Sequence, residues 1–178
     1  DQGALDARAM LLDNPSAVMM TGPFFASEQY TFWAMVANEL FLYILIPAAI
    51  MSVLLTVRHT RGEEEAGRLE MTRALPTGRL APAVAALIIV TVGNLALGAA
   101  VTVGTLAMGG ELAASLALGL ATALTGMVFA AVAAVTAQLT EHADTAAGMA
   151  LGLLALAFMV RGIGDVIDRQ GSWLSWFS

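Results

Sequence analysis

Residues 32–57 read FWAMVANELFLYILIPAAIMSVLLTV, and residues 58–79, which follow directly, read RHTRGEEEAGRLEMTRALPTGR. The first run is apolar and longer than the roughly 20 residues that a helix needs to cross a hydrocarbon core. The second run holds five of the eight arginines and the densest acidic stretch of the chain. Because another long apolar run follows it, this charged segment must lie in water between two membrane-spanning helices.

The composition supports a membrane protein throughout. Mean hydropathy is +0.78, with 58% hydrophobic and 12% charged residues, which leaves too little polar material to cover a soluble core. In lipid, only helices or a closed barrel satisfy the backbone, and the apolar runs are continuous rather than alternating, which favours helices. The net charge of −6 provides no basic patch for nucleic acid. Cysteine is absent, which excludes disulfides and thiolate metal sites.

The predicted fold is therefore all-α, a polytopic membrane helix bundle with four spanning helices. The chain divides into three parts: an extracytoplasmic loop with short interfacial helices (1–31), the four-span bundle (32–161), and an extracytoplasmic interfacial segment (162–178). Small residues recur along the third span, where they allow close helix packing in lipid. The four spans are expected at about 32–57, 80–108, 112–137 and 145–160.

Arginine placement predicts the orientation. The five arginines of segment 58–79 place it in the cytoplasm by the positive-inside rule. With four spans, both ends of the chain then lie outside and the turn at 138–144 lies inside. We expect a multi-pass protein of the plasma membrane, and a piece of a longer polypeptide.

Segment 58–79 also predicts a short helix over residues 62–75. Its first turn is acidic and its later cations suit the negative end of the helix dipole. Arg61 with Glu65, and Glu64 with Arg68, have the i,i+4 spacing of ion pairs. Such a helix either docks a soluble partner or is simply a solvated connector.

The run VRHTRGEEEAGRLEMTRALPTGR (57–79) resembles the first cytoplasmic loop of ABC transporter permeases of the actinobacterial polyketide-antibiotic exporter type, which includes tetronasin-resistance permeases. Met71 stands where that family usually has Leu. The stretch AAVTAQLTEHADTAAGMALGLLALAFMVRGIGD (133–165) and the terminal SWLSWFS are similar to later parts of the same family. The resemblance extends from about residue 32 to the end of the chain.

The resemblance implies spans two to five of the first half of a permease that exports hydrophobic, drug-like or antibiotic compounds. Segment 58–79 would be a coupling helix seated in a separate ABC ATP-binding subunit, itself a dimer, and a second permease half would complete the transporter. ATP and Mg would bind only in that partner, so this chain would carry no cofactor, catalytic residue or metal. The residues implied in coupling to the ATPase are Arg61, Glu63, Glu64, Glu65, Arg68, Glu70 and Arg73.

Two other functional classes remain open. Glu63-Glu64 and Arg68 fit the E-E-x-x-x-R motif of CAAX-type intramembrane proteases, but Leu55 and Gln138 stand four residues before His59 and His142, where those enzymes need Phe. A non-transporting membrane assembly subunit is the third class.

Three polar residues within the spans are candidates for a substrate path: Asn38, Glu39 and Asn94. A carboxylate inside a span is costly and suggests function, although Glu39 could also reach water or a neighbouring helix. Asn94 could instead form an interhelical hydrogen bond. Arg161 and Asp165 have i,i+4 spacing and are predicted to pair.

Overall fold

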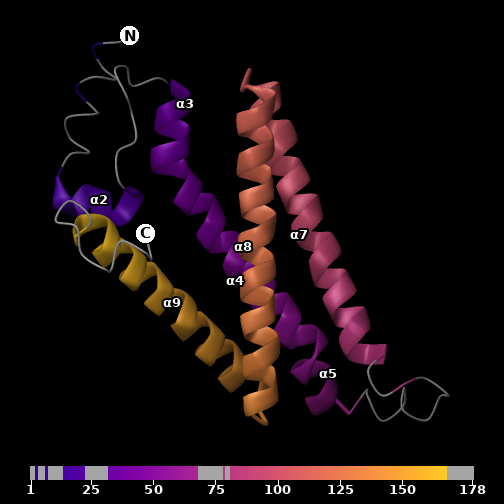
Figure 1. Ribbon diagram of the computed structural model, residues 1–178. Coiled ribbons are helices and arrows are strands. Elements are labelled where there is room, and N and C mark those ends of the chain that lie inside the picture. Colours follow the sequence, from indigo (N-terminus) through magenta and orange to yellow (C-terminus); the bar gives the residue numbers. More distant parts are fainter. Residues whose placement is uncertain are drawn as a thin grey trace. The chain divides into compact units, whose positions relative to one another are not determined.

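The computed structural model describes residues 3, 7, 14–22, 32–67, 78 and 81–167. Every regular element within these residues is a helix, which confirms the all-α prediction (Figure 1). Four stretches are long and apolar enough to cross a membrane, and each exceeds the roughly 20 residues required. They are Phe32–Glu65, Ala81–Ala107, Leu112–Leu139 and Ala143–Val166. The chain forms two compact units, one of Asp1–Ile44 with Ala155–Ser178 and one of Leu45–Leu154.

The first stretch is not a uniform α-helix. It starts as α3 (Phe32–Met35), continues as a π-helical turn, η1 (Val36–Leu40), and becomes α4 (Phe41–His59) before α5 (Arg61–Glu65). Pro47 lies inside α4 and has no N–H to donate, so one carbonyl of the preceding turn lacks its helical partner. The π-helical turn η1 contains Asn38 and Glu39.

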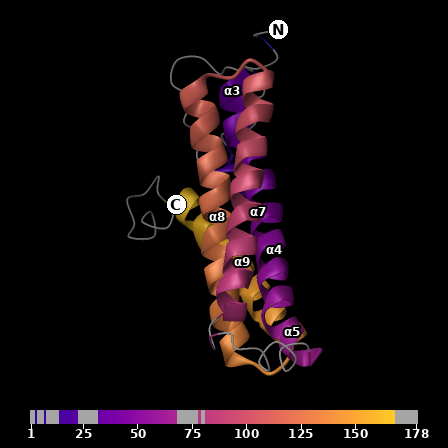
Figure 2. The same ribbon diagram turned by 90° about the vertical axis from the view of Figure 1, so that its right-hand side faces the viewer.

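α7 (Ala81–Ala107) and α8 (Leu112–Leu139) form an antiparallel hairpin (Figure 2). The buried positions of α7 recur every four residues, which defines one face. Gly98 of α7 meets Gly119 of α8 so closely that a Cβ on either residue would overlap the other's backbone. Small residues let helix backbones approach in lipid, as predicted for the third span. The buried residues of α7 are Ala86, Val90, Asn94 and Gly98.

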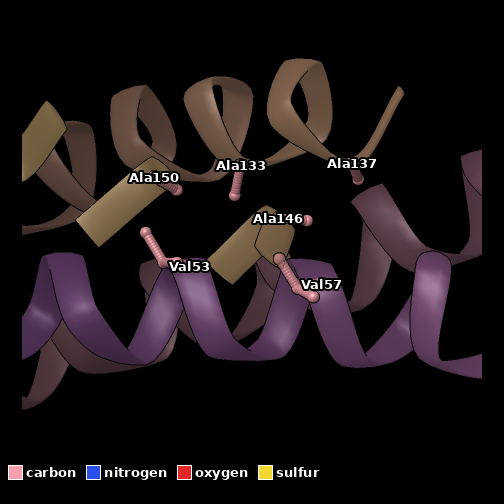
Figure 3. Close-up of a cluster of buried hydrophobic side chains, with 6 residues drawn as sticks. All are labelled: Val53, Val57, Ala133, Ala137, Ala146 and Ala150. Atoms are coloured by element: carbon pink, nitrogen blue, oxygen red, sulfur yellow. The ribbon is translucent and has the colours of Figure 1, made fainter. Parts of the chain in front are cut away.

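α9 (Ala143–Ile167) begins directly after the turn that follows α8. Its first half packs with α4 and α8 around a buried apolar cluster in which each helix contributes two residues four positions apart (Figure 3). Four of the six side chains are alanine, so the three backbones pack closely. The cluster consists of Val53 and Val57, Ala133 and Ala137, and Ala146 and Ala150.

Polar residues are buried and large apolar residues are exposed in the second unit. The buried polar residues include Ser52, Thr56, Asn94, Ser115, Thr122 and Thr136. The exposed large residues include Leu54, Ile88, Val92, Leu120, Leu124 and Val128. This distribution is the reverse of a water-soluble fold, and it suits a surface facing lipid or other apolar helices.

The first unit contains a short helix, α2 (Pro15–Thr21). The Asn14 side chain accepts a hydrogen bond from the N–H of Ala17 at 3.0 Å and so caps α2. Gly22 ends the helix with a φ of 94°. α2 is therefore a short helix within the segment 1–31, where the sequence predicted short interfacial helices.

The far end of α9 also belongs to the first unit. Arg161 pairs with Asp165 at 2.5 Å, which confirms that prediction, and donates to the carbonyl of Met19 at 3.1 Å. Its guanidinium lies 5.4 Å from the centroid of the Phe158 ring. These contacts pair the charge of Arg161 at the point where the apolar run ends. α9 continues there as a helix to Ile167, beyond the span expected at 145–160.

Candidate functional site

α5 is a five-residue helix with the sequence RGEEE, separated from α4 by a break at Thr60. Ala66 closes the helix, and Gly67 follows with a φ of 70°, a conformation that glycine adopts without strain. The prediction of one continuous helix over 62–75 is therefore wrong, because α5 ends at Glu65 and a turn follows at 66–67. Arg68, Glu70 and Arg73 lie outside the described residues.

Arg61 of α5 reaches the carboxyl end of α8. Its Nε and Nη2 donate to the carbonyl oxygen of Ala137 at 3.1 and 2.8 Å. The last four carbonyls of a helix lack intrahelical donors, and a cation suits the negative end of the helix dipole. The third nitrogen, Nη1, donates to the Glu64 carboxylate at 2.6 Å. The predicted pair between Arg61 and Glu65 is wrong, because Glu64 takes that place at i,i+3 spacing.

Glu65 reaches the amino end of α9. Its Oε1 accepts a hydrogen bond from the N–H of Ala143, the first residue of α9, at 2.8 Å. The same oxygen lies 3.4 Å from Nδ1 of His142. A carboxylate here satisfies one free N–H of the helix and faces the positive end of its dipole. Glu65 therefore caps a helix 78 residues away in the sequence.

The structure thus joins two segments that the sequence suggested separately, the charged connection after the first span and the turn at 138–144. Both lie at the same end of the second unit (Figure 1). Sequence reasoning did not identify Ala137 and Ala143, because they contribute only backbone atoms. One signal for the contact with α9 was available in the sequence. The residue before α9 is His142, whereas Ser, Thr, Asp or Asn usually caps a helix, so a free N–H at the start of α9 needs another acceptor.

The other predicted residues are in α5, η1 and α7. Glu63 is half-buried in α5. Asn38 and Glu39, both half-buried, occupy the π-helical turn η1 in the first unit. Among the described residues, the amide nitrogen of Asn38 is buried with no hydrogen-bond partner.

Asn94 lies in the second unit and is fully buried. Its Oδ1 accepts a hydrogen bond from Ser52 of α4 at 2.8 Å, and its Nδ2 donates to the carbonyl of Val90 at 2.9 Å. This is the interhelical hydrogen bond expected as the alternative to a substrate role.

These features define a multi-pass membrane helix bundle with a charged connection at one end. No protein-family model matches the chain. Over 127 residues the chain is 41% identical to a multidrug efflux system permease protein of Mycobacterium tuberculosis. The matched residues make up 71% of this chain and 23% of that protein, so the chain is similar to one part of a membrane permease.

Proposed function

We propose that this chain is part of the transmembrane permease of an ABC-type exporter, and that a separate ATP-binding subunit drives it. The observation that carries this proposal is the 41% identity over 127 residues to a multidrug efflux system permease protein. Segment 58–79 couples the spans to that subunit, and ATP and Mg bind in the subunit only. The substrates are hydrophobic, drug-like or antibiotic compounds, as expected for the tetronasin-resistance type. A second permease half completes the transporter.

The arrangement of α5 supports a coupling role. A helix of five residues is too short to be stable by itself, yet its contacts with the ends of α8 and α9 hold it in a defined place. A rigid charged element between two spans is suited to transmitting movement of a soluble partner. We place this end of the bundle in the cytoplasm, because five arginines crowd segment 58–79.

Asn38 and Glu39 are our candidates for the substrate path. π-helical turns occur frequently at functional sites, and a carboxylate within a membrane span suggests function. Asn38, the residue before Glu39, has a buried amide nitrogen with no hydrogen-bond partner among the described residues, and this nitrogen is a candidate donor to substrate. Asn94 is a weaker candidate, because its amide oxygen and nitrogen both make hydrogen bonds inside the bundle.

The experiment uses the complete polypeptide that contains this chain, produced together with its ATP-binding subunit and placed in inverted membrane vesicles. The probe is the hydrophobic dye Hoechst 33342, and its ATP-dependent accumulation is followed by fluorescence. Accumulation should require ATP and stop when the ATP-binding subunit carries an inactivating substitution in its phosphate-binding lysine. Accumulation that is independent of ATP, or a polypeptide that never co-purifies with an ATP-binding subunit, would contradict the proposal.

A further inference from the structure

Two helix ends in the second unit are closed by side chains from α5 rather than by residues of their own. The carbonyl of Ala137 near the end of α8 accepts two hydrogen bonds from Arg61. The N–H of Ala143 at the start of α9 donates to Glu65. One short helix therefore holds both sides of the turn that joins α8 to α9.

The charges of these side chains match what they contact. The guanidinium lies at the negative end of the α8 dipole and the carboxylate at the positive end of the α9 dipole. Hydrogen bonds in which one partner is ionised are about twice as strong as neutral ones. Glu64 also holds Nη1 of Arg61 at 2.6 Å, which fixes the guanidinium while its other nitrogens face Ala137. The three hydrogen bonds to Ala137 and Ala143 therefore tie α5 to both sides of the α8–α9 turn.

We propose that Arg61 and Glu65 are positioning residues, which transmit movement of α5 to α8 and α9, rather than contacts to the ATP-binding subunit. This inference rests on the proposed function, but it changes the role of two of the residues that the resemblance implied in coupling to the ATPase. In this arrangement, the two side chains are already bonded within the chain. Movement that the partner imposes on α5 then pulls directly on the ends of the third and fourth spans.

The test compares two neutral variants, Arg61→Gln and Glu65→Gln, with matched controls. Glu111→Gln and Glu141→Gln serve as controls, because both side chains lie outside segment 58–79, are exposed and make no hydrogen bond or ion pair among the described residues. The complete polypeptide and its ATP-binding subunit are reconstituted in nanodiscs. Each test variant should retain the ATP-binding subunit and its basal ATP hydrolysis, but lose about tenfold in substrate stimulation, the scale of one charged hydrogen bond. Arg61→Lys keeps the charge without the two-nitrogen contact and should recover only part of the stimulation.

A second measurement follows the contact itself and needs no ATPase. This chain has no cysteine. Once any cysteine elsewhere in the complete polypeptide is replaced by serine, nitroxide labels are placed at Ala66→Cys and Gln138→Cys, both exposed positions. The distance distribution between the labels should be narrow in the parent and both controls, and should broaden in Arg61→Gln and Glu65→Gln. If no ATP-binding subunit associates with any variant, the proposed function fails while this distribution still tests the contact.

Three results would overturn the inference. The first is an unchanged distance distribution in both test variants. The second is loss of the ATP-binding subunit from the test variants without broadening, since that result would make the side chains direct partner contacts. The third is broadening with full substrate stimulation, since the contact would then carry no movement.

Discussion

At the scale of single residues, a polar contact point joins three helices of the second unit. Ser52 of α4 donates to Asn94 of α7. Gly126 of α8 lies against both, and a Cβ added there would overlap Asn94 and come within 2.8 Å of the Ser52 hydroxyl. A hydrogen bond between membrane helices is therefore combined with a glycine that leaves room for it.

Gly126→Ala should destabilise the bundle by about 1–3 kcal/mol, because the added methyl group meets a packed interior. The matched control is Gly93→Ala in α7, where a Cβ would meet nothing within 4 Å. That control should be neutral or slightly stabilising, since alanine favours helix over glycine. Unfolding in detergent measures both variants. Equal effects of the two substitutions would contradict the close approach at Gly126.

A double-mutant cycle with Ser52→Ala and Asn94→Ala measures the hydrogen bond between α4 and α7. The expected coupling is about 0.6 kcal/mol and at most about 1.7 kcal/mol, the range for polar contacts between membrane helices. Unfolding of the parent, both single variants and the double variant supplies the four free energies. Coupling near zero would show that each residue acts alone, and a substrate role for Asn94 would gain weight.

At the scale of elements, the sequence predicted the spans because apolar length is a strong signal. It predicted the ends less well. α9 continues to Ile167, past the span expected at 145–160, and Arg161 at the end of the apolar run pairs with Asp165 and donates to the distant Met19 carbonyl. Likewise, i,i+4 spacing suggested that Arg61 pairs with Glu65, whereas in the structure Glu65 accepts a hydrogen bond from the first N–H of α9. Backbone groups 76 and 78 residues away decide these contacts, and no local pattern reveals them.

The packing of α4, α8 and α9 also gives a prediction at this scale. Ala133 is fully buried in the apolar cluster, so Ala133→Leu should force the three helices apart at a cost of about 1–3 kcal/mol. Ala131→Leu on the exposed side of the same helix is the control and should leave the unfolding free energy unchanged. Thermal unfolding in detergent compares the two. A small effect at Ala133 would mean that the cluster is loosely packed.

At the scale of the whole molecule, the multi-pass architecture followed from composition alone, because a chain with so few charged residues cannot cover a soluble core. Sidedness stays a prediction that labelling can test. Ala66→Cys directly follows α5. Met108→Cys lies in the turn between α7 and α8, at the end of that hairpin away from α5 (Figure 1). Both positions are exposed. In intact cells, a membrane-impermeant maleimide should label Met108→Cys only. Labelling of Ala66→Cys from outside would reverse the orientation.

The hydrogen bond from Arg161 to the Met19 carbonyl has a consequence for the order of folding. These residues are 142 positions apart, and at ribosomal rates of roughly 5–20 residues per second Arg161 is made about 7–28 s after Met19. Until then α2 lacks this hydrogen bond. α2 can therefore reach this contact only after the fourth span has been synthesised as far as Arg161, so a helix made early is fixed late.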